Sequence, residues 1–180
     1  STGFSNGALL SSVIACTMDD RFAAVAPVAG IDVFDGCDGT RPVPALAFHG
    51  TDDPILLFNG GVGDRLGQAL SGGEVDEEPL PEADLDGEGY PANAADWAAR
   101  NGCSLELTDD RELTPTVLER TWLCPAEGVV TFEIMVGAGH SWPGSAFTKS
   151  IEQIVGPTDM SIDGTDMIWR FFQRFALPAG

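Results

Sequence analysis

The chain has 180 residues and a formal net charge of −19, because 28 acidic side chains outnumber 9 basic ones. The length suits one domain, and an apolar content of 43% is typical of a globular protein and excludes a long disordered chain. The negative charge argues against nucleic acids and anionic membrane surfaces as partners, since both would repel it. No apolar run approaches the roughly 18 residues that a transmembrane helix needs.

The first half of the chain predicts a turn, two helices and two buried strands. Residues 3–7 form a glycine-rich turn, and the apolar stretch after them predicts a helix over 8–15. The runs FAAVAPVA (22–29) and PALAFHG (44–50) are short, apolar and followed by turn residues, which indicates buried strands. A second helix is expected over 62–70.

Residues 72–91 are acidic and rich in proline and glycine, which predicts a solvated loop or an insertion. Part of this stretch is faintly similar to a calcium-binding loop. However, Asn93 stands where such a loop has its final glutamate, and Pro79 and Pro81 exclude the helix that would enter it. We therefore expect no metal ion here.

The second half of the chain alternates again between helical and strand patterns. A helix is expected over 93–101 with Asn93 as its N-cap, followed by strands over 116–123 and 129–136. Residues 137–160 are expected to be loop, and an amphipathic helix runs from 163 or 165 to 175. Strands separated by helices predict an α/β fold with a largely parallel sheet.

The four cysteines, Cys16, Cys37, Cys103 and Cys124, favour two disulfides. Three connectivities are possible, and we prefer pairing between neighbours in the sequence, which closes two loops of roughly 20 residues, each stabilising the fold by about 3 kcal/mol. The alternative is four buried free thiols. A structural zinc site is not expected, because the chain has no CxxC pair and only two histidines.

Residues Gly3-Phe4-Ser5-Asn6-Gly7 match G-x-S-x-G, the pattern of a nucleophile elbow. In such an elbow the serine lies on a sharp strand-to-helix turn, where small neighbours let the chains pass closely. The following helix directs its N-terminus toward a developing oxyanion. The helical pattern ALLSSVIAC follows at once. We therefore expect Ser5 to be a nucleophile and the backbone N–H of Asn6 to be one oxyanion donor.

An acid and a histidine follow Ser5 in the chain order of such a catalytic triad. Asp53 lies in the turn HGTDDP after one expected strand, and His140 lies in GHSWPG after another. The carboxyl ends of parallel strands meet at one edge of a sheet, so these side chains are expected to converge. His140 would take the proton of the Ser5 hydroxyl, and Asp53 would orient the imidazole and stabilise the imidazolium.

Each of these residues also has a less specific explanation. Ser5 and Asp53 could be ordinary turn residues, and Asp52 competes with Asp53 for the role of the acid. His49 stands at a strand end before glycine, so we expect a packed, hydrogen-bonded structural histidine. Trp142 could belong to the core or form a wall of an acyl pocket. We favour the substrate-binding role, because Trp142 lies two residues from His140.

Taken together, these motifs resemble the poly(3-hydroxybutyrate) depolymerase and feruloyl esterase-like group of α/β-hydrolases. The resemblance implies a serine esterase, usually secreted, with Ser5, Asp53 and His140 as its triad and no cofactor. In the family pattern H-G-T-x-D the acid is the second aspartate, and the Cys103–Cys124 pair also matches the family. The matching segments span nearly the whole chain: GFSNGALL (3–10), DRFAAVAPVAG (20–30), RPVPALAFHGTDDP (41–54), FNGG (58–61), NGC (101–103), GAGHSWPG (137–144) and IDGTDMIWRFF (162–172).

The position of the elbow departs from the family pattern. Several strands and an oxyanion loop precede it in a complete α/β-hydrolase, whereas only two residues precede the motif here. A circular permutation has no room after His140. We therefore expect residues 1–180 to be a single, partial α/β-hydrolase catalytic domain from the nucleophile elbow onward. We also expect the isolated chain to aggregate, dimerise or fold partly, and to hydrolyse little.

The leading hypothesis is a secreted or periplasmic serine carboxylesterase. Its ester substrate, polymeric or small, would be a short-chain polyester of the polyhydroxyalkanoate kind, or a feruloyl or acetyl ester of the plant wall. The alternative is a catalytically incomplete fragment or a non-enzymatic, polymer-binding remnant of such an esterase. A dipeptidyl-peptidase-like hydrolase shares the triad, but the sequence has no evident acidic pair to recognise a substrate amine. The oligomeric state stays open.

Overall fold

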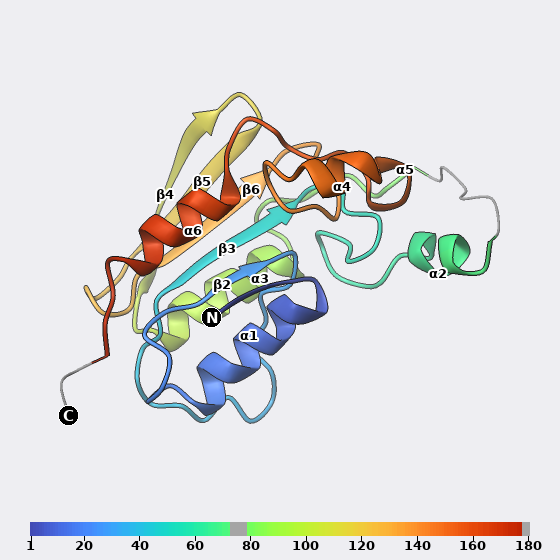
Figure 1. Ribbon diagram of the computed structural model, residues 1–180. Helices are drawn as coiled ribbons and strands as arrows, with labels where there is room; N and C mark the ends of the chain where they lie inside the picture. Colours follow the sequence, from blue (N-terminus) through green and yellow to red (C-terminus); the bar gives the residue numbers. More distant parts are fainter. Residues whose placement is uncertain (73–78, 178–180) are drawn as a thin grey trace.

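One mixed sheet organises the computed structural model, which describes residues 1–72 and 79–177. Within these residues the sheet has six strands in the order β1-β2-β3-β6-β5-β4 (Figure 1). The strands are β1 (Thr2–Phe4), β2 (Ala26–Val28), β3 (Ala45–Gly50), β4 (Ser104–Thr114), β5 (Val117–Leu123) and β6 (Val130–Met135). The α/β class is as expected from the sequence.

The pairing of the strands corrects one part of that expectation. Strands β1, β2, β3 and β6 are parallel neighbours, whereas β5 pairs antiparallel with both β6 and β4. The sheet is therefore mixed rather than largely parallel. The expected strand over 22–29 is also shorter, since only Ala26–Val28 forms β2.

The two central strands explain the position of the core. Every residue of β3 and of β6 is buried, as expected for strands that are covered on both faces. Alternate side chains of β3 point to opposite faces, so Ala45 and Ala47 join one apolar cluster while Leu46 and Phe48 join another. The sheet thus lies between two hydrophobic layers.

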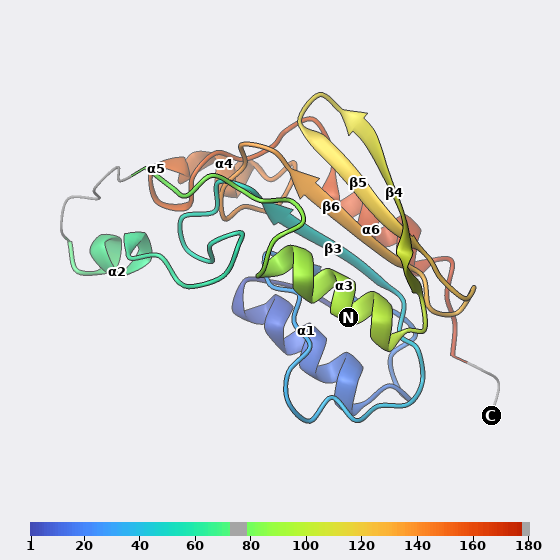
Figure 2. The ribbon, with the colours of Figure 1, turned by 180° about the vertical axis from the view of Figure 1, so that it is seen from behind.

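Helices cover both of these layers (Figures 1 and 2). The helices are α1 (Asn6–Thr17), α2 (Arg65–Leu70), α3 (Tyr90–Arg100), α4 (Ala146–Ser150), α5 (Glu152–Val155) and α6 (Gly164–Phe172). Helices α1 and α3 lie on one face of the sheet, and α6 lies on the other. In helix α3 the buried Trp97 anchors this packing, because its indole N–H donates to the Val43 carbonyl. None of the described helices is long and apolar enough to cross a membrane.

Several element boundaries differ from those expected. Helix α3 begins at Tyr90 instead of Asn93, because Pro91 fits the first helical turn and Gly89 adopts a positive φ of 78° before it. Asn93 does not cap the helix; its side-chain amide donates to the Ile31 carbonyl instead. Helix α6 ends at Phe172, three residues before the expected end.

Two parts of the structure, strand β4 and the pair of short helices α4 and α5, have no counterpart in the sequence-based expectation. Strand β4 carries the charged sequence SLELTDDRELT, which hides the strand pattern, and charged pairs such as Arg120–Asp110 join it to β5. The segment 137–160, expected to be loop, contains the short helices α4 and α5. Of the acidic stretch 72–91, residues 79–89 form neither helix nor strand, and residues 73–78 lie outside the described part of the chain.

Both disulfides join neighbours in the sequence, so the preferred connectivity is confirmed. Cys16 near the end of α1 pairs with Cys37, and Cys103 pairs with Cys124 across the base of the β4–β5 hairpin. Each bridge spans 21 positions of sequence. The first bridge links α1 to the loop that leads into β3. The second bridge links the start of the edge strand β4 to the end of β5.

Candidate active site

Three parallel strands end at the same edge of the sheet, and each is followed by one of the residues that the motifs single out. Ser5 follows β1, Asp53 lies three residues after β3, and His140 lies five residues after β6. Parallel strands direct their carboxyl ends to one side of the sheet, which is where α/β proteins gather polar side chains for binding and chemistry. The topology therefore accounts for the approach of segments that are far apart in sequence.

Ser5 adopts a backbone conformation that is unusual for a residue with a side chain. Its φ is 58° and its ψ is −121°, outside the regions that L-residues ordinarily occupy. Gly3 makes this turn feasible, because a Cβ at Gly3 would lie 2.2 Å from the carbonyl oxygen of Gly7. Gly30 is also tight, since a Cβ there would lie 3.0 Å from the Ser5 carbonyl oxygen.

Gly7, the second glycine of the motif, is not needed to leave room for a neighbouring chain. A Cβ on Gly7 would meet no atom within 4 Å outside its own turn of helix. It is the backbone of Gly7, and not a missing side chain at that position, that crowds Gly3. The close approach in the turn therefore requires a glycine only before Ser5.

Helix α1 begins directly after Ser5 with backbone donors that have no acceptor within the helix. Ala8 and Leu9 donate their N–H groups to the Ser5 carbonyl, whereas Asn6 and Gly7 stand at the first two positions, whose N–H groups have no acceptor within the helix. The helix has no side-chain cap and no acidic residue in its first turn. This end of α1 therefore presents donors and the positive end of the helix dipole beside Ser5.

Asp53 is held by four neighbouring donors although it is only 1% exposed. Its Oδ1 accepts 2.8 Å hydrogen bonds from the backbone N–H groups of Ile55 and Leu56. Its Oδ2 accepts a 2.7 Å bond from His140 Nδ1 and lies 3.3 Å from His49 Nε2. Burial by itself would raise the pKa of Asp53, but the contacts with His140 and His49 outweigh burial and lower that pKa to about 2. Asp53 is therefore a carboxylate at neutral pH.

Two hydrogen bonds donated by backbone N–H groups attach the loop of Asp53 to the loop of His140. The Asp52 N–H donates to the Ala138 carbonyl, and the Gly137 N–H donates to the Thr51 hydroxyl. The loops approach so closely at Gly50 that a Cβ there would lie 2.1 Å from the Ala138 oxygen. Contacts between the two loops thus support the Asp53–His140 hydrogen bond.

His140 is nearly buried and directs one nitrogen to Asp53. Its backbone N–H donates to Val155, and its ring lies against the ring of Phe4 with centroids 4.8 Å apart. Phe4 directly precedes Ser5 in the chain. The Ser5 hydroxyl itself makes no hydrogen bond to any residue in the described ranges 1–72 and 79–177. The structure brings Asp53 and His140 into direct contact, and it links Ser5 to them only through Phe4, whose ring packs on His140.

The competing residues occupy different surroundings. Asp52 is exposed and accepts a hydrogen bond from the Thr51 hydroxyl, so it does not contact His140. His49 is fully buried, donates to the Leu56 carbonyl and stacks on Tyr90 with centroids 3.7 Å apart. His49 is therefore packed and hydrogen-bonded, as the sequence predicts.

Trp142 is half-buried and packs on the apolar cluster beneath α6. Its indole N–H donates to the Thr165 hydroxyl, which fixes the ring against the start of that helix. Its part in binding an acyl group stays a prediction.

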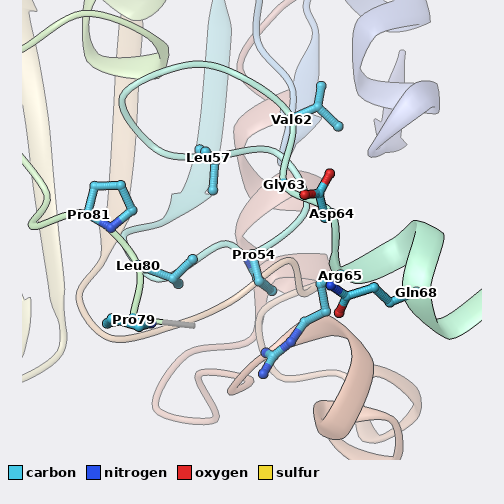
Figure 3. Close-up of a pocket in the computed structure, with 10 residues that line it drawn as sticks. All are labelled: Pro54, Leu57, Val62, Gly63, Asp64, Arg65, Gln68, Pro79, Leu80 and Pro81. Carbon is cyan, nitrogen blue, oxygen red and sulfur yellow. The ribbon is translucent and has the colours of Figure 1, made fainter. Parts of the chain in front are cut away.

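Next to the Asp53 loop lies a cavity of about 490 Å³ (Figure 3). In Figure 3, Leu57, Leu80 and Pro81 from the loops around it face the cavity together with residues of α2. Ser5, Asp53 and His140 do not line it. A smaller cavity of about 190 Å³ touches Asp53 beside Phe58. Among the described residues, no group of three His, Cys, Asp or Glu side chains could hold a metal ion.

Sequence reasoning missed the residues that support the acid. Tyr90, Leu56 and Ile55 surround His49 and Asp53 through ring stacking and backbone groups, for which no short motif exists. One local signal was available: an aspartate often accepts a hydrogen bond from the backbone N–H two residues later, in an Asx-turn. Asp53 and Ile55 have this spacing.

Comparison with known proteins finds similarity to esterases over parts of their length, while no family model matches the chain. The chain is 35% identical to feruloyl esterase B of Piromyces equi over 109 residues, which cover 58% of this chain and 18% of that protein. It is 34% identical to feruloyl esterase C of Emericella nidulans over 107 residues, or 57% of this chain and 36% of that protein.

A longer match reaches a bacterial protein. The chain is 28% identical over 167 residues to the protein named putative esterase NocK of Nocardia uniformis, covering 91% of this chain and 47% of that protein. The chain thus spans less than half the length of each of these relatives. The similarity places the chain beside feruloyl esterases and a further protein named as an esterase.

Proposed function

We propose that this chain is the part of a serine carboxylesterase that carries its catalytic triad, in an α/β-hydrolase fold. The observation that carries the proposal is the 2.7 Å hydrogen bond between the buried Asp53 carboxylate and His140, at the sheet edge where Ser5 has its strained turn. The mixed sheet, the disulfides and the similarity to esterases support it. The proposal treats residues 1–180 as one catalytic domain or part of one.

The reaction follows from the roles of the three side chains. The Ser5 hydroxyl attacks the ester carbonyl carbon while His140 Nε2 accepts the hydroxyl proton. The carbonyl oxygen becomes an oxyanion, which the N–H groups of Asn6 and Gly7 at the start of α1 stabilise. The imidazolium then gives its proton to the departing alcohol and an acyl-serine remains. Water, activated by His140, hydrolyses this acyl-enzyme and releases the acid.

Asp53 serves this reaction without taking up a proton. Its Oδ2 holds the His140 Nδ1–H, which leaves Nε2 as the nitrogen available to Ser5. Because the pKa of Asp53 is held at about 2, the carboxylate stays charged at neutral pH and stabilises the imidazolium that forms.

The substrate class follows from the relatives and from the resemblance. The names of the fungal relatives favour esters of hydroxycinnamic acids, such as feruloyl esters of the plant wall. A short-chain polyester is the second class, and the resemblance to polyester depolymerases is its basis. Trp142 would flank the acyl group from the α6 side. The two disulfides favour an oxidising compartment, consistent with secretion or the periplasm.

The test compares the wild type with Ser5→Ala and with the control Ser150→Ala, which removes an exposed hydroxyl on α4. Methyl ferulate, p-nitrophenyl acetate and a short 3-hydroxybutyrate oligomer serve as substrates. The wild type and Ser150→Ala are expected to hydrolyse these esters at equal rates, low as the sequence predicts, and Ser5→Ala is expected to lose that hydrolysis. Equal rates in wild type and Ser5→Ala would refute the proposal.

An incomplete, polymer-binding chain is the second candidate. It is favoured by the absence of a hydrogen bond between Ser5 and His140 within the described residues, and by the position of β1 at the edge of the sheet. Such a chain would bind insoluble polyester or wall polysaccharide equally well in the wild type and in the Ser5→Ala variant, and it would hydrolyse none of the three substrates. The same proteins therefore separate the two candidates.

A further inference from the structure

His49 is a second histidine in contact with Asp53, and the reaction above does not use it. It lies in β3 with no exposed surface, four residues before Asp53. Its Nε2 is 2.9 Å from the Leu56 carbonyl oxygen and 3.3 Å from Asp53 Oδ2. The ring stacks on Tyr90 at 3.7 Å with an angle of 19° between the planes. One nitrogen of this buried ring therefore faces the acid and the turn that carries it.

The surroundings of the other nitrogen determine the protonation state. His49 Nδ1 is buried and has no hydrogen-bond partner among the described residues. A proton there would leave a buried N–H group unpaired, which costs about 1–3 kcal/mol, in addition to the cost of a buried charge. The ring therefore carries a proton on Nε2, where the Leu56 carbonyl accepts it.

The proton on His49 Nε2 lies close to both the Leu56 carbonyl and Asp53 Oδ2. By holding the Leu56 carbonyl, His49 fixes the turn whose Ile55 and Leu56 N–H groups bind Asp53 Oδ1. The same N–H lies next to Oδ2, the oxygen that accepts the bond from His140. No other side chain contacts both the turn and Oδ2 within the described part of the chain.

We propose that His49 is a positioning residue that keeps the Asp53 carboxylate ionised and oriented toward His140. Its catalytic consequence rests on the function proposed above. Without the His49 N–H, Asp53 Oδ2 loses one of its two neighbouring donors, and the turn that aims it becomes looser. The pKa of Asp53, which the contact with His49 helps to hold down, should therefore rise, and the looser turn should lower kcat.

The experiment follows the side-chain carboxyl ¹³C signal of Asp53 by NMR as the pH is lowered, and the loss of that signal in Asp53→Asn assigns it. His49→Leu removes the N–H, and His49→Gln keeps an amide N–H of comparable reach. Val130→Ala, at the far end of β6, is the control for a buried substitution that leaves Asp53 untouched.

The proposal predicts that His49→Leu raises the pH midpoint of the Asp53 carboxyl titration by about 0.5–1 unit, while His49→Gln and Val130→Ala keep the wild-type midpoint. In His49→Leu, kcat should be lower by roughly ten- to a hundredfold, with KM little changed. Loss of stability alone would scale the rates without moving the Asp53 midpoint. An Asp53 midpoint in His49→Leu that is equal to or below the wild-type value would overturn the proposal.

A measurement on the wild type does not depend on whether the variant folds. The ¹⁵N shifts of His49 should report a proton on Nε2 at neutral pH, and a ring whose proton lies on Nδ1 would also overturn the proposal. The proposed function can fail separately. Wild-type and Ser5→Ala proteins that hydrolyse equally would refute the esterase, whereas the two NMR measurements still decide whether His49 orients Asp53.

Discussion

Asp53 Oδ2 accepts a 2.7 Å hydrogen bond from His140 Nδ1, although 87 positions of sequence separate the two residues. Both belong to loops that follow neighbouring parallel strands, and the loops are joined through Thr51 and Asp52 to the segment before His140. The pair therefore depends on the central β3–β6 ladder, and the chemistry proposed for it also needs Ser5, which follows β1.

Replacing Asp53 by Asn should affect the proposed reaction far more than the same change at Asp52. The new amide in Asp53→Asn could offer an N–H in place of an acceptor, which favours the wrong imidazole tautomer, and the negative charge is lost. We expect kcat for p-nitrophenyl acetate to fall by about 10⁴-fold. Asp52→Asn, which changes an exposed carboxylate bonded to Thr51, should retain wild-type kcat within about twofold. Similar losses in both variants would contradict the assignment of the acid.

The depressed pKa of Asp53 predicts a loss of stability in acid. In the folded protein this pKa is about 2, below the ordinary value of 3.8, so the folded state favours the carboxylate. The resulting stabilisation, about 2 kcal/mol, is fully present above pH 4 and is lost as the pH falls toward 2. Urea unfolding of wild type and Asp53→Asn between pH 5 and pH 2 measures it. The difference in unfolding free energy should shrink with acid, and a constant difference would be inconsistent with the proposed ionisation.

The raised pKa of Glu133 predicts that the free energy of unfolding falls as the pH rises, which is opposite to the effect of Asp53. This residue of β6 is fully buried, and burial first, then the neighbouring carboxylate of Glu119 on β5, raise its pKa from 4.5 to about 8. The folded state thus favours the protonated acid. Its stabilisation is fully present below pH 4.5 and is lost as the pH rises to about 8.

Glu133→Gln removes that titration. Between pH 5 and pH 8.5 the unfolding free energy of the wild type should fall relative to Glu133→Gln by more than about 1 kcal/mol. The control Glu112→Gln, on the exposed face of β4, should follow the wild type. Parallel curves for wild type and Glu133→Gln would mean that Glu133 keeps an ordinary pKa in the folded protein.

The turn around Ser5 predicts unequal effects on stability for its two glycines, Gly3 and Gly7. A Cβ at Gly3 would overlap the Gly7 carbonyl at 2.2 Å, so Gly3→Ala should lower the unfolding free energy by about 3 kcal/mol. Gly7→Ala meets open space in a helix and should change it by less than about 1 kcal/mol, in the stabilising direction. Urea denaturation distinguishes them, and equal destabilisation would argue against the turn as described.

The sequence indicates much of this fold because its strong patterns are local. The apolar runs that predict strands are found in the structure as β3 and β6. The spacing of the cysteines predicts the two disulfides that the structure has. Strand β4 was missed because its alternation is masked by charges that pair with β5 across the hairpin. Helices α4 and α5 are too short for a helical period to be visible.

The site shows a similar division. Ser5, Asp53 and His140 lie in motifs of a few residues, so the sequence alone singles them out, and their catalytic roles stay predictions. The neighbours of Asp53 come from distant segments: Tyr90 opens α3 and stacks on His49, and Phe4 packs on His140. Contacts of this kind depend on the tertiary packing of several elements, and no spacing in the sequence reports them.

Labelling with a fluorophosphonate, followed by peptide mass spectrometry, tests the central claim most directly. The account predicts one covalent adduct on Ser5 of the folded chain, with a labelling rate that falls at least about 100-fold in His140→Ala. A folded protein in which Ser5 stays unmodified, or in which the adduct forms at the same rate without His140, would contradict the account.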